Sequence, residues 1–126
     1  MQIPPNNSGI FIGGDNSGTA VIAQDITNSF NKATGEVKSE PLKATLEELH
    51  TQIQELLKNT TDPDKQKEIA DNAKMVAEQS ASEKPNKGWL EVSAKGLIEA
   101  ATAVKDLAAP VLATVTTLLG FFGMVL

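Results

Sequence analysis

The single histidine of the chain, His50, is the residue best suited to acid–base chemistry. Glu47 and Gln54 stand three and four residues away, so a helix would place all three on neighbouring positions of one face. A carboxylate beside an imidazole can act as a general acid–base pair. Such a pair needs a nucleophile or a second base, and the sequence places no serine, cysteine or further histidine beside it. We therefore expect His50 to be a surface residue and the protein not to be an enzyme.

A glycine-rich segment, residues 13–18 (GGDNSG), is the second candidate, because such loops can bind phosphate. It lacks the GxxxxGK[ST] pattern, and no lysine precedes Lys32. Asp15 and Asp25 offer carboxylates for calcium, but the glycine–aspartate spacing of calcium-binding nonapeptides is absent. The segment therefore predicts a turn, and we expect no cofactor and no metal site.

Composition excludes further classes of site. The 126 residues include no cysteine, which rules out disulfides and thiolate metal ligands. All eleven basic residues are lysines and the net charge is −5, which argues against nucleic acid as a partner, because arginine supplies the bidentate contacts to phosphate and guanine. The N-terminal residues MQIPPNNSG do not resemble a secretion signal. We expect a cytoplasmic location, either free or at the inner membrane.

Residues 1–35 predict a β-prone segment that drives self-assembly. The tripeptide Asn-Ser-Gly begins at residue 7 and again at residue 16, and β-forming residues follow each copy. A hairpin through residues 13–16 is one form; a β solenoid, a trimeric β prism and a polar arm without fixed structure are the alternatives. In an assembly, four residues of the exposed strand edges would pair between subunits: Ile10, Ile12, Val21 and Ile22.

Residues 36–106 predict helices, after a linker at residues 31–40. Apolar residues recur at spacings of 4, 3, 4 and 3 along the first helix, which is a heptad-like seam: Leu42, Leu46, Leu49, Ile53 and Leu56. Leu46, Leu49 and Ile53 are expected to help close the assembly. Ser39 and Asp62 are candidate N-caps, each with a proline in the first turn, so two helices joined by a short turn form an antiparallel pair. A third, amphipathic helix starts near Asn86 and reaches Pro110, which kinks or ends it.

Residues 107–126 (LAAPVLATVTTLLGFFGMVL) contain no charged side chain and predict a long apolar C-terminal helix. A helix of this length spans about 30 Å, which is enough to cross the core of a bilayer. Burial at the centre of an oligomer explains the segment equally well. The ring of Trp89 would be either an anchor at a membrane interface or a lid over the helices. The side chains expected in a membrane or a protein core are Trp89, Leu112, Leu118, Leu119, Phe121 and Phe122.

Two stretches carry a resemblance. Residues 6–26 (NNSGIFIGGDNSGTAVIAQDI) are similar to the β-assembly segments of bacterial immune signalling. The stretch from Gly88 to Leu112 resembles the ends of small bacterial proteins that combine an Asn/Ser/Gly-rich N-terminus with a helical middle and an apolar tail. The resemblance implies a self-assembling accessory or effector of a bacterial conflict or defence system, and it supplies no catalytic residues.

Taken together, these patterns predict a mainly α fold with a short N-terminal β hairpin, a helical hairpin and a long apolar C-terminal helix. The expected function is non-enzymatic homo-oligomerisation, with the C-terminal helix buried in the assembly or inserted in a membrane. The expected partners are further copies of the chain and membrane lipid. The alternative is a soluble adaptor that binds a protein partner by adding its N-terminal strand to the partner's sheet.

Overall fold

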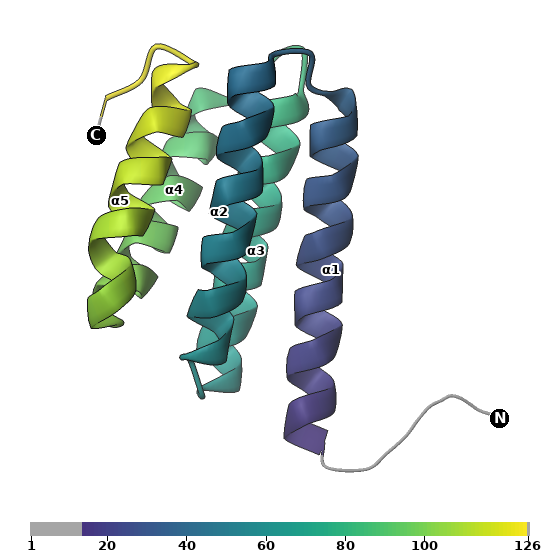
Figure 1. The fold of residues 1–126 in the computed structure, drawn as a ribbon, viewed down its shortest axis with the longest axis vertical. Coiled ribbons are helices and arrows are strands. Elements are labelled where there is room, and N and C mark those ends of the chain that lie inside the picture. The colour runs from purple at the N-terminus through teal and green to yellow at the C-terminus, as the bar shows by residue number, and fades with distance from the viewer. Residues whose placement is uncertain (1–13, 126) are drawn as a thin grey trace, which may run out of the picture.

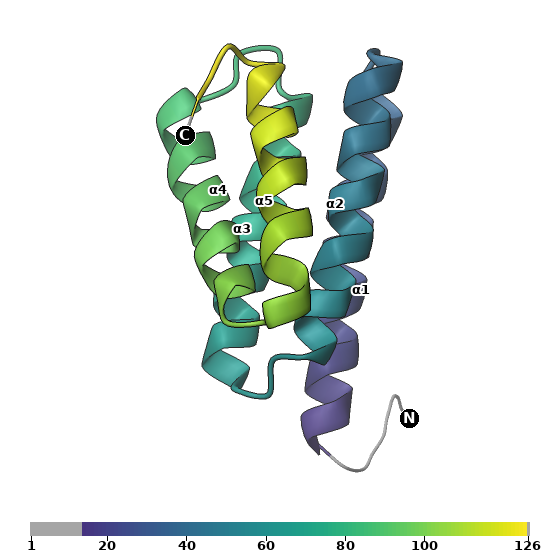
Figure 2. The ribbon, with the colours of Figure 1, turned by 60° about the vertical axis from the view of Figure 1, so that its left-hand side comes forward.

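The computed structural model describes residues 14–125, with side chains from residue 20 onward, and this part of the chain forms five helices and no strand (Figure 1). The helices are α1 (Gly14–Glu36), α2 (Glu40–Lys58), α3 (Pro63–Ala81), α4 (Lys87–Thr102) and α5 (Lys105–Gly120). They run alternately up and down, joined by short connections (Figure 1). Neighbours follow the order α1, α3, α4, α5, α2 and back to α1, with a smaller contact between α2 and α3, so the helices form a ring around one apolar core. Figure 2 shows α5 between α4 and α2 in this arrangement.

Three helices begin where the sequence predicts, because a side chain satisfies a backbone N–H that has no partner inside the helix. Before α2, Ser39 Oγ accepts from the N–H of Leu42 at 3.3 Å. Before α3, Asp62 Oδ1 accepts from the N–H of Asp64 at 2.9 Å. Before α4, the side chain of Asn86 also accepts a hydrogen bond from the backbone of the first turn.

The predicted N-terminal β segment is wrong over residues 14–35, which belong to α1. The strand residues Val21 and Ile22 lie in this helix, with Val21 exposed and Ile22 half-buried against the core. The segment has a helical apolar seam at spacings of 4, 4, 3 and 4: Ile22, Ile26, Phe30, Ala33 and Val37. Packing of this seam on α2 and α3 outweighs the low helix propensity of the glycines and β-branched residues. Ile10 and Ile12 lie outside the described residues.

The structure also differs from the sequence prediction at the linker and at the long C-terminal helix. Residues 31–36 of the linker are the last turns of α1. The third predicted helix ends at Thr102, and the chain reverses at Val104, whose φ of −118° and ψ of 101° are extended. Pro110 therefore lies inside α5, in its second turn. It is tolerated because Pro110 and Asp106, whose carbonyl would have accepted the missing N–H, are both exposed to water.

Candidate functional site

The outward face of α5 is the most distinctive surface of the described chain, because it carries no charge from Leu107 onward. The inner face is buried through Val111, Thr114, Val115, Leu118 and Leu119. Two large apolar side chains border the outward face, Leu112 at 46% exposed and Phe121 at 41%. Small and uncharged residues occupy its remaining exposed positions: Ala109, Pro110, Ala113, Thr116, Thr117 and Gly120. This arrangement permits close approach of another surface without the cost of burying a charge.

The other four helices expose charged side chains, whereas α5 exposes them only in its first turn, at Lys105 and Asp106. Examples are Asp25 on α1, Glu48 on α2, Glu68 on α3 and Lys95 on α4. Removing water from a charged face on contact with a partner costs free energy, unless a group of opposite charge on the partner pairs with it. Among the described helices, α5 therefore offers the surface that can be covered at the lowest electrostatic cost.

The side chains that the sequence assigned to a membrane or a core fall into two groups. Leu118 and Leu119 are buried in the core, and Phe122 is half-buried against it. Leu112, Phe121 and Trp89 are exposed, and Trp89 at 57% exposed covers little of the bundle. Among residues 14–125, no helix combines the length and the apolar character needed to cross a membrane.

The seam residues Leu46, Leu49 and Ile53 are fully buried inside one chain. They line the face of α2 that contributes to the central core, together with Leu42, Leu56 and Leu57. Their apolar surface is already buried within the single chain. They therefore leave no surface for contact with a second copy.

His50 lies in a polar network between α1 and α2, and not on an open surface as the sequence suggested. Its ring stacks on Phe30, with ring centroids 5.2 Å apart and planes 13° apart. Thr27 Oγ1 lies 3.0 Å from His50 Nε2, and Gln54 Nε2 lies 3.1 Å from the same atom. Gln54 Nε2 also donates to the carbonyl oxygen of Ala23 at 3.2 Å. The partners from α1 were not foreseen, because that segment was predicted to be β.

The amide of Gln54 joins His50 to α1. A carbonyl only accepts hydrogen bonds, so Gln54 turns its NH₂ group toward Ala23, and the same nitrogen lies 3.2 Å from Thr27 Oγ1, to which it also donates. Burial lowers the pKa of His50 below its ordinary value of 6.5 and so favours the neutral ring. The network thus links α1 to α2, and Glu47, which was considered as an acid–base partner, is not among the described contacts of His50.

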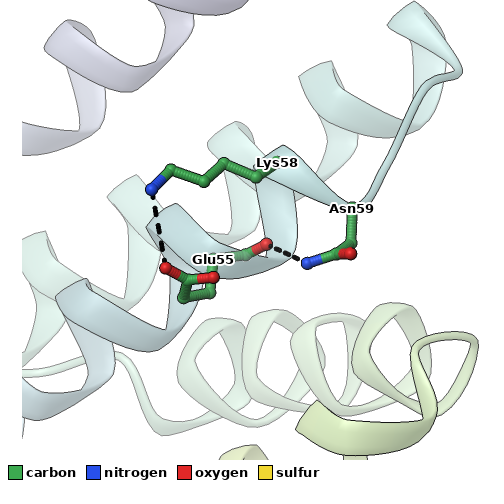
Figure 3. Close-up of polar contacts among 3 residues, drawn as sticks. All are labelled: Glu55, Lys58 and Asn59. Carbon is green, nitrogen blue, oxygen red and sulfur yellow. Dashed lines mark hydrogen bonds and ion pairs between the residues drawn. The ribbon is translucent and has the colours of Figure 1, made fainter.

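A cleft of about 450 Å³ lies at the end of the bundle that holds the α2–α3 turn and the end of α4. Its walls include Asn59 and Thr60, whose side chains are engaged in ending α2. Asn59 Nδ2 donates to the carbonyl of Glu55 at 2.9 Å, beside the Lys58–Glu55 ion pair at 3.5 Å (Figure 3). Thr60 Oγ1 donates to the carbonyl of Leu56 at 2.8 Å. These polar groups serve the local fold, and the described residues contain no group of side chains suited to hold a metal ion.

Comparison of the chain with protein-family models, with curated proteins and with solved structures finds no match in any of the three. The function must therefore be argued from the surface and packing of this chain alone.

Proposed function

We propose that the protein is a non-enzymatic helical module that associates with further copies of itself through the outward face of α5. The observation that supports this function is the charge-free exposed face bordered by Leu112 and Phe121. In a two-fold dimer the same patch lies on both partners, so a charged face would meet its own charge. The chain has a net charge of −5, and the α5 face is free of that repulsion.

The size of the outward face of α5 determines how strong the self-association should be. A helix of 16 residues is about 24 Å long. Stable protein–protein interfaces bury about 800 Å² on each partner, which is more than one such helix face supplies. We therefore expect a weak, concentration-dependent association. The role of an assembling effector in bacterial defence is part of this proposal and is supported by the resemblance of the sequence alone.

Light scattering across a concentration series tests the proposal. We expect the mean mass to rise above the monomer mass of 13.3 kDa as the concentration of the full chain rises. Leu112→Glu places a charge on the face and should keep the protein monomeric. The matched control is Val21→Glu, which adds the same charge at an exposed position of α1 and should associate like the wild type.

Two results would refute this function. The first is a wild-type mass that stays at 13.3 kDa at every concentration. The second is equal association of the wild type and Leu112→Glu, since the contact would then lie elsewhere. Circular dichroism of both variants confirms that each remains helical, so that a change in mass reports association.

A further inference from the structure

The cleft of about 450 Å³ lies between the α2–α3 turn, α3 and the end of α4, and its volume falls within the range of about 300–1,000 Å³ of small-molecule sites. Both views show the α2–α3 turn and the end of α4 at the same end of the bundle (Figures 1 and 2). The apolar part of the wall comes from α3 and α4: Ile69 is buried, and Ala100 and Val104 are half-buried against the core. This part of the wall can cover the hydrocarbon part of a bound molecule.

The cleft also contains charged side chains that the fold does not use. Lys65 and Glu68 line it from α3, and Glu99 lines it from α4. None of the three forms an ion pair or a hydrogen bond with any other residue that the structure describes. Lys65 and Glu68 are three residues apart on one helix, a spacing that permits an ion pair, and still remain separate. Their charges are therefore available to a ligand.

The half-buried amide of Asn72 adds an uncharged polar group at the edge of the cleft. It lies against Gly96, which belongs to the wall, so closely that a Cβ on Gly96 would be 2.9 Å from Cγ of Asn72. Within the described chain this amide has no hydrogen-bond partner. An amide that is partly withdrawn from water and unpaired is stabilised by a ligand that forms a hydrogen bond with it.

The balance of charge around the cleft favours a ligand with an excess of positive charge. Its wall holds one ammonium group, that of Lys65, and three carboxylates, those of Asp62, Glu68 and Glu99, which gives a net charge of −2. On the adjoining turns the signs are balanced, by two acidic and two basic residues: Asp64, Asp106, Lys67 and Lys105. The nearby lysines 58 and 95 are paired with glutamates 55 and 91, at 3.5 and 3.3 Å.

The placement of the free charges distinguishes an organic cation from a metal ion. Among the described residues, no group of three acidic or histidine side chains is close enough to hold a metal ion. Glu68 and Glu99 belong to different helices that form different parts of the wall. They therefore suit two separate cationic groups on one molecule, and Lys65 beside Glu68 suits an anionic group next to one of them.

We propose that the cleft binds a basic α-amino acid, a small zwitterion with a second cationic group at the end of an aliphatic chain. Lys65 Nζ donates to the carboxylate of the ligand, and Glu68 accepts from its α-ammonium group. The aliphatic chain lies on the apolar part of the wall, and Glu99 accepts from the terminal cation. The site is separate from the outward face of α5, so it does not depend on self-association.

Three related molecules test which groups are recognised: L-lysine, L-norleucine, which lacks the terminal ammonium group, and cadaverine, which lacks the carboxylate. Each is titrated into the isotope-labelled full chain, and binding is followed by the NMR shifts of backbone amides in the cleft wall, such as those of Thr61 and Ala100. We expect saturable shifts with L-lysine. L-norleucine and cadaverine should each bind about fivefold more weakly, because each lacks one solvent-exposed ion pair.

Two variants assign the charges. Glu99→Gln should weaken the binding of L-lysine about fivefold and should not weaken L-norleucine, which has no cation for Glu99. Lys65→Met should weaken L-lysine to the same extent and should not weaken cadaverine, which has no carboxylate. The matched controls are Glu48→Gln on α2 and Lys67→Met on α3, at exposed positions outside the cleft wall, and both should bind L-lysine like the wild type.

The proposal is overturned if L-lysine causes no saturable shift in the cleft wall, or if L-norleucine and cadaverine bind as tightly as L-lysine. It is also overturned if Glu48→Gln loses as much binding as Glu99→Gln, since the effect would then be one of net charge alone. Tighter binding of cadaverine than of L-lysine would assign the cleft to a diamine and reject the amino acid. Leu112→Glu should bind L-lysine like the wild type, which separates this result from a failure of self-association.

Discussion

Replacement of Phe30 by alanine tests whether α1 is an integral part of the fold. Phe30 is 1% exposed and lies between α1 and α2, where its ring stacks on His50. Removing a buried phenylalanine side chain costs about 3–5 kcal/mol, because it loses apolar burial and leaves a cavity. A domain of this size has a free energy of unfolding of roughly 5–15 kcal/mol. The substitution should therefore remove about a fifth of the free energy of unfolding or more.

Urea unfolding provides the measurement. With a denaturant slope of about 2 kcal/mol per molar, a loss of 4 kcal/mol moves the midpoint by about 2 M. The unfolding midpoints from the far-UV signal and from the Trp89 emission should shift together, because the five helices unfold as one unit. This is a stringent test, since Trp89 is on α4, whose neighbours are α3 and α5 and not α1. Val21→Ala, at an exposed position of the same helix, should change the free energy of unfolding by less than about 0.5 kcal/mol.

A small effect of Phe30→Ala, equal to that of Val21→Ala, would refute the packing of α1 described above. A large shift of the far-UV midpoint with an unchanged Trp89 midpoint would be consistent with a helical α1 but would show that α1 unfolds separately from α4. Neither outcome is compatible with a ring of five helices that shares one core.

Two further predictions concern single positions. Because burial lowers the pKa of His50, the folded state favours the neutral ring, so this contribution to stability is complete above about pH 6.5 and is lost as the pH falls through the lowered pKa. An NMR titration of the imidazole should give a pKa below 6.5, and a value at or above 6.5 would contradict the burial of the ring. For Gly96, an added Cβ would lie 2.9 Å from Cγ of Asn72. Gly96→Ala should therefore yield its helix-propensity gain of about 1 kcal/mol only in an Asn72→Ala background, as measured by urea unfolding; the same gain in both backgrounds would show that Asn72 moves aside without cost.

Local sequence chemistry determined where three of the five described helices begin. Ser39, Asp62 and Asn86 cap the helices that follow them, and each cap involves residues at most three positions apart. Such hydrogen bonds join residues that are close in the sequence, so the residue types alone reveal them. The buried seam of α2 was equally visible, because its spacing matches one face of a helix.

The tertiary structure decided the state of residues 14–35, the partners of His50 and the exposed face of α5, since these depend on which helices pack together. Residues 14–35 form a helix because Ile26 and Phe30 are buried where α1 packs against α2 and α3. The turn-forming Asn, Ser and Gly residues near them in the sequence give no sign of this packing. His50 acquired its partners only when α1 packed beside α2. The apolar C-terminal segment was evident from its composition, but composition cannot divide a uniformly uncharged helix into faces. Packing against α2 and α4 buried Leu118 and left Leu112 in water, and that division creates the surface from which a function can be argued.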